Sequence, residues 1–283
     1  MSVCLRPSSI LAGSFVCLAV SLVACTSAGG VAGSPPALST ERIAAIVASP
    51  DRSAADRTND VRRKPVELLA FIGVQPGMTV LDISAGGGYT SELLARAVGP
   101  DGRVYGQSAP PDPSRVPPAA AEGGAAAATP APPPRRTSAM ALAERAKNPA
   151  AANLFAVVAP FANPVPPAMA SQSFDLATLM FNYHDFGHMG IDRAAMNRAI
   201  FAALKPGGIY VIGDHAGRPG TGISESGTLH RVEEDFVVRE VEAAGFKLAQ
   251  RGSFLRNPND PRDRDEPAPP MPKDEFVLKF VKP

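Results

Sequence analysis

Cysteine is scarce in this chain of 283 residues, and its distribution excludes several kinds of protein. The three cysteines are Cys4, Cys17 and Cys25, so the chain beyond residue 25 has neither a thiol nor a disulfide. An excess of one charge is lacking too, because 28 Lys and Arg residues balance 27 Asp and Glu residues. Without a basic stripe, the sequence does not indicate a nucleic-acid-binding protein.

Long hydrophobic runs are also missing. The apolar segment at residues 10–24 is shorter than the roughly 20 residues that a membrane span needs. Arg6 precedes it and small residues end it, which is typical of a secretory signal peptide over residues 1–24. Leu22-Val23-Ala24-Cys25 resembles the lipobox of bacterial lipoproteins. This resemblance implies cleavage before Cys25 and a lipid on its sulfur. An ordinary signal peptide that contains a cysteine is the alternative.

The residues after the lipobox predict where the protein resides. By analogy with lipoprotein sorting, Thr26 favours the outer membrane over the inner one. Residues 25–38 are rich in Gly, Ser, Ala and Pro and are interpreted as a lipid-anchored flexible tether. We therefore expect a protein anchored to a membrane on the periplasmic side of the cell envelope. A cytosolic protein with a misleading lipobox is the other possibility.

Residues 39–283 are enough for one α/β domain, and helical and β-type patterns alternate along them. This alternation predicts a doubly wound, mostly parallel sheet, and the last two strands, with no helix between them, imply one antiparallel strand. The segment 108–138 is mostly Pro, Ala and Gly and predicts a disordered insertion. We predict helices at 40–47, 59–72, 89–98, 138–147, 191–204 and 229–244, and strands at 78–83, 103–107, 153–158, 174–181, 209–213, 246–254 and 275–281.

The most informative segment is the turn after the strand predicted at 78–83. Asp82 is followed by Ser84 and then by three glycines, Gly86 to Gly88, before a helical pattern begins. Glycines let the backbone approach a ligand, and a helix N-terminus offers unpaired N–H groups, so this order predicts a nucleotide cradle. A dehydrogenase would carry the spacing G-x-G-x-x-G, which these glycines lack.

These features together resemble the class I S-adenosylmethionine-dependent methyltransferases, over about residues 60–282. The resemblance implies a seven-stranded sheet, S-adenosylmethionine as cofactor, and methyl transfer to a small molecule or an envelope component. The alternative is a non-catalytic envelope lipoprotein that keeps a degenerate form of this fold as a binding module. The resemblance rests on Asp82 to Gly88, Phe174-Asp175, Leu204-Lys205-Pro206-Gly207-Gly208 and Ala243-Ala244-Gly245-Phe246.

The resemblance implies cofactor contacts at the turn. It assigns Gly86 and Gly88 to the methionine and ribose parts and Asp82 to the methionyl ammonium, although Asp82 could equally hold the turn. Ser84 stands where the family has its first glycine, so its backbone must avoid a positive φ or absorb strain. Gln107 replaces the usual acid at the end of the second strand, and a neutral amide is a weaker acceptor for ribose hydroxyls.

Candidate catalytic residues follow the fourth and fifth predicted strands, because reacting groups gather at the carboxyl edge of such a sheet. His184 is the candidate general base, since its ordinary pKa lies near neutrality. Asp185 and His215 are further candidates, and a structural role is the alternative for these side chains. Asn182 is assigned to the cofactor; no Pro-Pro follows it, so the Asn-Pro-Pro-Tyr signature for nitrogen acceptors is absent.

A metal site is considered and not predicted. His184 and His188 are four residues apart, but this spacing converges on a metal only within a helix, and nearby glycines favour a loop. His230 and Arg231 are predicted to open the last helix, where a cation is mildly unfavourable. We therefore expect these two side chains to face a substrate or an acid, with ordinary surface placement as the alternative. The sequence carries no mark of an oligomeric state.

Overall fold

The computed structural model describes most of the chain: residues 1–3, 36–111, 136–267 and 269–283. The predicted cleavage site, the lipidation of Cys25 and most of the tether lie outside these residues. The same holds for most of the predicted insertion, although its end residues Ser108 and Ser138 belong to a strand and a helix. The chain divides into Met1–Ser34 and Pro35–Pro283, and every helix and strand described below lies in the second unit. No helix in the described parts is both long and apolar enough to cross a membrane.

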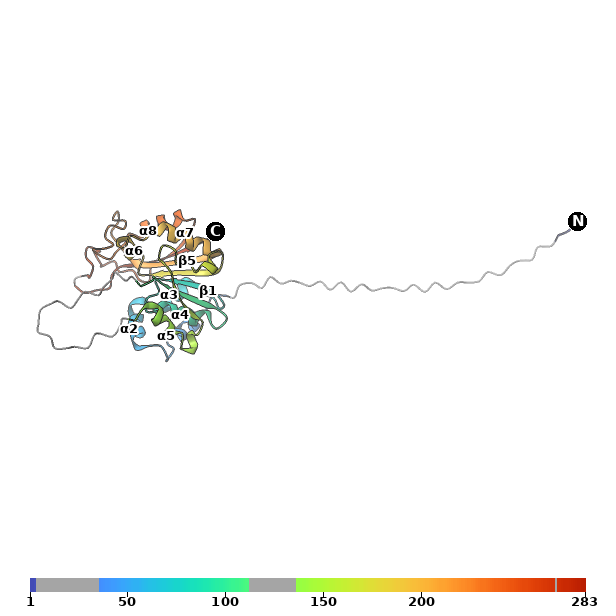
Figure 1. The fold of residues 1–283 in the computed structure, drawn as a ribbon, viewed down its shortest axis with the longest axis horizontal. Helices are drawn as coiled ribbons and strands as arrows, with labels where there is room; N and C mark the ends of the chain where they lie inside the picture. The colour runs from blue at the N-terminus through green and yellow to red at the C-terminus, as the bar shows by residue number, and fades with distance from the viewer. Residues whose placement is uncertain (4–35, 112–135, 268) are drawn as a thin grey trace. The chain divides into compact units, whose positions relative to one another are not determined.

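A sheet forms the centre of the second unit (Figure 1). It has seven strands in the order β3-β2-β1-β4-β5-β7-β6. β7 pairs antiparallel with both of its neighbours, whereas the other pairs are parallel. The predicted doubly wound sheet with one antiparallel strand is therefore confirmed. The strands are β1 (Thr79–Ile83), β2 (Arg103–Ser108), β3 (Leu154–Val158), β4 (Phe174–Met180), β5 (Leu204–His215), β6 (Lys247–Gly252) and β7 (Glu275–Val281).

Helices cover both faces of this sheet (Figure 1). One apolar core joins the sheet to α1, α3, α4 and α5, and a second core joins the opposite face to α7 and α8. This is the layered arrangement that a doubly wound sheet requires to bury both of its faces. The α-helices are α1 (Thr40–Val47), α2 (Ala54–Arg63), α3 (Pro65–Ile72), α4 (Tyr89–Val98), α5 (Ser138–Arg145), α6 (Asp185–His188), α7 (Arg193–Ala203) and α8 (Glu234–Ala243).

Strand β1 shows how the pleat aims a polar side chain at a helix. Val80 packs in the core with α4, whereas Leu81 and Ile83 pack in the opposite core. Because successive side chains of a strand alternate between faces, Asp82 shares the face of Val80. It therefore meets Ser91 in α4, and their side chains are hydrogen-bonded.

The helical region before β1 is divided differently from the prediction. A helix was expected at 59–72, but α2 begins earlier, after Ser53, whose hydroxyl caps it. Lys64 has a left-handed backbone with φ of 43° and separates α2 from α3. Pro65 begins α3, where its missing N–H costs nothing. Gly73 ends this helix with φ of 74°, as the sequence predicted.

The prediction that the last helix opens near residue 229 is wrong, because α8 begins at Glu234. His230, with a left-handed φ of 50°, and Arg231 lie in the loop before it, and Val232 forms a β-bridge with Ala216. The fully buried guanidinium of Arg231 lies 2.8 Å from the carboxylate of Asp260, so it faces an acid, as expected.

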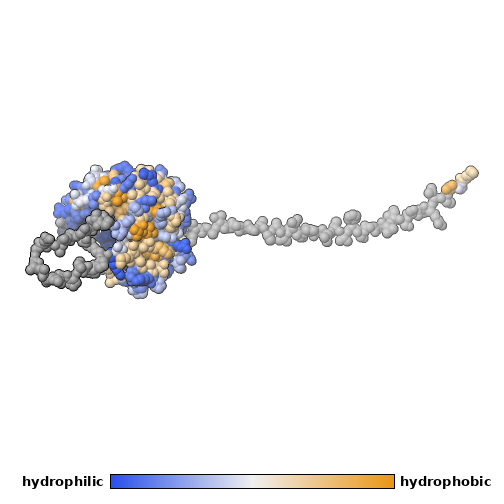
Figure 2. All heavy atoms as spheres, in the orientation of Figure 1, coloured by the Kyte–Doolittle hydropathy of each residue, from blue (hydrophilic) through white to orange (hydrophobic). Residues whose placement is uncertain are grey.

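The described surface is mixed in polarity. Figure 2 shows hydrophobic residues in groups between hydrophilic ones over the visible face. The large exposed apolar side chains include Phe155 and Val158 on the edge strand β3, and Val61 and Met140 on helices. Scattered residues of this kind are normal on a folded surface and do not identify a site.

Candidate active site

Two cavities lie at the carboxyl edge of the sheet, next to the turn that follows β1. Their volumes are about 350 Å³ and about 520 Å³, and both are lined by Ser84 and Gly86. The smaller cavity also contacts Asp82 and Asn182, and the larger one contacts Ser108. Ligands of doubly wound sheets bind at this edge. The glycine turn predicted from the sequence therefore forms the shared wall of a two-part cleft.

The turn itself, residues 82–88, is here called the glycine corner. Ser84 has φ of 54° and Gly88 has φ of 83°, both in the left-handed region. A β-carbon on Gly88 would approach Leu142 and Arg145 to 2.8 Å, so only glycine fits there. The sequence allowed Ser84 either to avoid a positive φ or to absorb backbone strain. The structure has the strained backbone.

The Asp82 side chain is buried and hydrogen-bonded within the fold. It is 2 % exposed, and its carboxylate accepts hydrogen bonds from the Ser91 hydroxyl at 2.5 Å and the Thr178 hydroxyl at 2.7 Å. Burial raises the pKa of Asp82 to about 6, against the opposing effect of these two hydrogen bonds. Asp82 thus borders the cleft while linking β1 to α4 and β4. These contacts are those of a residue that holds the turn.

Gln107 is fully buried and also serves the turn. Its side-chain carbonyl accepts the Ser84 N–H at 3.0 Å, and its amide nitrogen donates to the Ala159 carbonyl at 2.6 Å. It does not line either cavity, so its side chain does not lie where the expected ribose contact would be made. Ser108, the next residue, does line the larger cavity. The sequence analysis missed Ser108 because it ended this strand one residue early.

Side chains from α2 and α5 complete the smaller cavity, and the motif analysis missed them. They are Asp56, Asn59, Arg63 and Arg145. The Arg145 guanidinium is already paired with the Asp56 carboxylate at 2.7 Å. The Arg63 guanidinium instead lies 3.7 Å from the centre of the Phe181 ring. Burial lowers the pKa of Arg63 to about 10, and it makes no ion pair within the described residues. The cavity therefore has a cationic group without an acidic partner there.

The four histidines of the sequence gather at the ends of β4 and β5. The ring centres of His184 and His215 are 5.4 Å apart, and His230 lies 5.7 Å from His184 and 5.8 Å from His188. His184 and His188 lie at the two ends of one helical turn, whereas His215 and His230 come from other segments that only the folded chain brings close to them. We use the name histidine corner for His184, Asp185, Asp214, His215 and His230.

His184 lies between two carboxylates. Its Nδ1 is 2.6 Å from Asp214 Oδ1, and its Nε2 is 3.2 Å from Asp185 Oδ1. Burial by itself would lower the pKa of His184, but the carboxylates of Asp214 and Asp185 outweigh it and raise the pKa to about 10. The ring therefore carries a proton at neutral pH. A general base must be unprotonated, so this state does not fit the role predicted for His184.

The other predicted residues lie around this pair. Asn182 donates to Asp185 Oδ2 at 2.9 Å and also lines the smaller cavity, so it joins the histidine corner to the cleft. His215 Nδ1 lies 3.1 Å from Glu275 Oε1, within ion-pair distance but without hydrogen-bond geometry. The structure thus brings Asn182, His184, Asp185 and His215 together at one edge of the cleft.

The expectation of a loop after β4 is wrong, because α6 forms one helical turn there. His188 nevertheless does not join His184 at a common point, since its backbone N–H and Nδ1 are both bonded to the Ser226 hydroxyl, at 2.8 Å and 3.0 Å. The donor atoms that do converge belong to His184, Asp185 and His230. His230 could not have been found from spacing, because it lies over 40 residues further along the chain.

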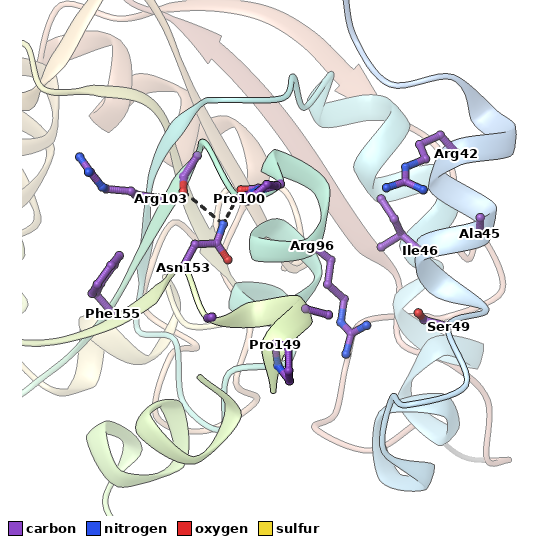
Figure 3. Close-up of a pocket in the computed structure, with 14 residues that line it drawn as sticks. Arg42, Ala45, Ile46, Ser49, Arg96, Pro100, Arg103, Pro149, Asn153 and Phe155 are labelled. Carbon is purple, nitrogen blue, oxygen red and sulfur yellow. Dashed lines mark hydrogen bonds between the residues drawn. The ribbon is translucent and has the colours of Figure 1, made fainter. Parts of the chain in front are cut away.

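Another cavity, of about 600 Å³, lies beside the start of β2 (Figure 3). Arg42, Arg96 and Arg103 line it, but the Arg96 guanidinium is already paired at 2.7 Å with both Asp51 and Glu92. This is the amino edge of the sheet, opposite to the edge at which such folds bind their ligands. The candidate site is therefore the two-part cleft and the histidine corner beside it.

Solved structures resemble this chain over most of its length. An S-adenosylmethionine-dependent methyltransferase from Aquifex aeolicus covers 87 % of this chain and 100 % of its own, with a TM-score of 0.54 and 16 % identity. A chain from a complex of a methyltransferase and its activator from Haloferax volcanii covers 87 % and 99 %, with a TM-score of 0.52 and 17 % identity. An arsenic(III) S-adenosylmethionine methyltransferase from Chlamydomonas reinhardtii covers 88 % and 73 %, with a TM-score of 0.51 and 15 % identity.

Sequence comparisons reach less far. No family profile matches the chain. A protein-L-isoaspartate O-methyltransferase from Aeropyrum pernix is 55 % identical over 38 residues, which are 13 % of this chain and 15 % of that protein. The chain thus matches only a small part of this curated relative. The structural likeness and the strand order establish the architecture: the chain has the fold of the class I S-adenosylmethionine-dependent methyltransferases.

Proposed function

We propose that this protein is an S-adenosylmethionine-dependent methyltransferase that binds its cofactor in the two-part cleft. The observation that carries the proposal is the pair of cavities sharing Ser84 and Gly86 at the carboxyl edge of the sheet. A ligand with an amino-acid end and a nucleoside end needs two joined compartments of this kind. The solved structures with the same fold are methyltransferases, which supports the same assignment.

The residues of the cleft fit the two ends of this cofactor. Arg63 can pair with the methionyl carboxylate, because a guanidinium binds carboxylates strongly and its pairing capacity is unused by the described acids. Asp82 and Asn182 border the same cavity and offer oxygens to the ammonium. Ser108 in the larger cavity can bond a ribose hydroxyl, and Phe161 supplies an apolar wall for the base.

The histidine corner is the place for the methyl acceptor. S-adenosylmethionine supplies a methyl group on a positively charged sulfur, which leaves by in-line displacement. The chain must therefore align the acceptor rather than activate the donor. Both ring nitrogens of His184 face carboxylates, so the partly exposed Asp185 is the group that can accept a hydrogen bond from the methyl acceptor. His215, beside Glu275, stays a candidate for taking the acceptor's proton. The acceptor is a small molecule or an envelope component.

Calorimetry on the full chain tests the cofactor assignment, with S-adenosylmethionine and methylthioadenosine as probes. Methylthioadenosine lacks the carboxylate, so Arg63→Gln should weaken binding of S-adenosylmethionine about 10- to 100-fold and leave the shorter probe unaffected. Arg57→Gln on the same helix is the matched control, since among the described residues the Arg57 guanidinium bonds only the Ser49 carbonyl. No heat with millimolar S-adenosylmethionine would overturn the proposal.

A non-catalytic binding module is the second candidate. It is favoured by Asp82 and Gln107, whose polar atoms are bonded within the fold. The two candidates differ in turnover. An enzyme releases S-adenosylhomocysteine when it is incubated with the cofactor and an extract of the cell envelope. A module binds the cofactor, or another ligand of the cleft, and releases none.

We further propose that the protein is a lipoprotein of the cell envelope, anchored through Cys25 and facing the periplasm, with the outer membrane as its site. The lipobox and the following Thr26 support this proposal. Growth with labelled palmitate should label the protein, and Cys25→Ala should abolish the label. An unlabelled protein in the soluble cytosolic fraction would refute the anchor. That result would also put the cleft in the compartment where the cofactor is made.

A further inference from the structure

Three donor atoms in the histidine corner lie close to one another. Asp185 Oδ1 lies 3.2 Å from His184 Nε2 and 3.6 Å from His230 Nδ1. The donor atoms offered by these three residues all lie within 4.8 Å of one another. Two imidazoles and one carboxylate are the ligand types that divalent transition ions such as Zn²⁺ prefer.

The distances between these atoms match a coordination shell. Bonds of about 2.0–2.1 Å in a tetrahedron separate neighbouring ligand atoms by about 3.3–3.4 Å. The two separations measured from Asp185 Oδ1, 3.2 Å and 3.6 Å, lie on either side of this value. The donor atoms of His184 and His230 lie within 4.8 Å of one another, so His230, whose side chain is 42 % exposed and lies in a loop, is the ligand that closes the shell by moving inward.

The surroundings of the cluster hold two of its members in place. Asp214 lies 2.6 Å from His184 Nδ1, which fixes the ring and leaves Nε2 directed at Asp185. Asn182 donates to Asp185 Oδ2, so Oδ1 is the oxygen turned toward both rings. A carboxylate behind a histidine and a hydrogen bond to a ligating carboxylate are the supports that protein metal sites use.

We propose that the histidine corner binds one divalent transition-metal ion of the zinc type through His184 Nε2, Asp185 Oδ1 and His230 Nδ1. On binding, the ion replaces the proton on His184 Nε2, and this proton passes to solvent. Three protein ligands leave one position open, as in catalytic zinc sites. The inference goes beyond the proposed function, because cation binding requires no cofactor in the cleft.

The open position has a consequence for methyl transfer, and this step rests on the proposed function. Asn182 contacts both Asp185 and the smaller cavity, so the metal centre lies beside the cleft. A hydroxyl or thiol on the ion would lose its proton more readily and become a better nucleophile.

Cobalt titration of the full chain, stripped with a chelator, tests the site. Co²⁺ should bind with one equivalent and give the visible absorption of a four-coordinate centre, and Zn²⁺ should displace it. His230→Ala should weaken binding about 100-fold or more. His188→Ala is the matched control, because His188 lies beside His230 but is bonded to Ser226, and it should bind as the unaltered protein does. Circular dichroism confirms that both variants are folded.

Three results overturn the proposal: absence of one-equivalent Co²⁺ binding, unchanged binding in His230→Ala, or equal loss in His188→Ala. If Co²⁺ does not bind with one equivalent, the short distance between His184 Nε2 and Asp185 Oδ1 reflects an ordinary contact between an imidazole and a carboxylate. Calorimetry with S-adenosylmethionine on the same metal-free sample separates this proposal from the proposed function. If the cofactor binds and cobalt does not, only the metal site is rejected. If cobalt binds and the cofactor does not, only the cofactor assignment is rejected.

Discussion

Asp82 and Asp214 are both buried carboxylates at the carboxyl edge of the sheet, yet they have different partners. Asp82 in the glycine corner accepts hydrogen bonds from two hydroxyls. Asp214 in the histidine corner faces the His184 ring at 2.6 Å and accepts the backbone N–H groups of His184 and His215 at 2.7 Å. The first corner is thus held by neutral groups and the second by a charged pair. Burial at equal depth therefore leads to different chemistry, because the neighbours decide which charge state is favoured.

The largest expected effect is the loss of Asp214. Asp214→Ala removes the acceptor of two buried donors and one partly buried donor, and leaves the His184 imidazolium without its closest counter-charge. The free energy of unfolding should fall by about 3–5 kcal/mol, as measured by denaturant titration. Asp263→Ala is the control, since Asp263 is exposed and, within the described part of the chain, forms an ion pair only with Arg264, and it should change stability little. Equal effects of the two substitutions would contradict the contrast between the corners.

A pH series isolates the other carboxylate. Because the pKa of Asp82 is raised from its ordinary 3.8 to about 6, its protonated form is the one that the fold favours. Its contribution to stability is complete below pH 3.8 and is lost as the pH rises through 6. The stability of the protein relative to Asp82→Asn should therefore fall by roughly 2 kcal/mol between pH 4 and pH 7. A flat difference across this range would mean that Asp82 is ionised throughout.

Two adjacent glycines give a matched test of the glycine corner. Gly88→Ala places a β-carbon 2.8 Å from Leu142 and Arg145 on a left-handed backbone. It should lower the free energy of unfolding by about 2 kcal/mol. Gly87→Ala meets nothing within 4 Å and has no positive φ, so its effect should be much smaller. Thermal and denaturant unfolding of both variants measure the difference. A Gly87→Ala variant as unstable as Gly88→Ala would show that crowding is not the cause.

The smallest predicted change is a gain. Ser84 has φ of 54°, which costs a residue with a β-carbon more than it costs glycine. Ser84→Gly should raise the free energy of unfolding by up to about 1 kcal/mol, because the released strain exceeds the added entropy of the unfolded chain. Ala85→Gly is the control and should lower stability. If both substitutions destabilise equally, the backbone at Ser84 is not strained.

The glycine corner was predictable because its signals are local. The apolar strand, Asp82, Gly86 to Gly88 and the helix that follows lie within about twenty consecutive residues, and the structure has each element close to its predicted bounds. The same local signals predicted Gly73 as a helix end. They misjudged Gln107, because an amide bonded to Ser84 and Ala159 looks no different in sequence from one facing a ligand.

The histidine corner was only partly predictable. His184, Asp185 and His215 were identified because they follow strands whose carboxyl ends share one edge. Pairing of β4 with β5 then brings Asp214 against His184, a contact between residues 30 positions apart. His230 was assigned to a helix that begins later, so the third donor atom could not be foreseen. Contacts at this range depend on loop paths that periodicity does not encode.

By itself, the sequence determined the alternation of helices and strands and the glycine turn, because hydrophobic period and backbone freedom act over a few residues. Only the tertiary structure decided which charges meet. The fold places the Arg63 guanidinium over the Phe181 ring and hydrogen-bonds the Asp82 carboxylate to two hydroxyl groups. It also places the His184 ring between two carboxylates. Electrostatic character depends on distances across the fold and on burial, and neither of these is a property of neighbouring residues in the chain.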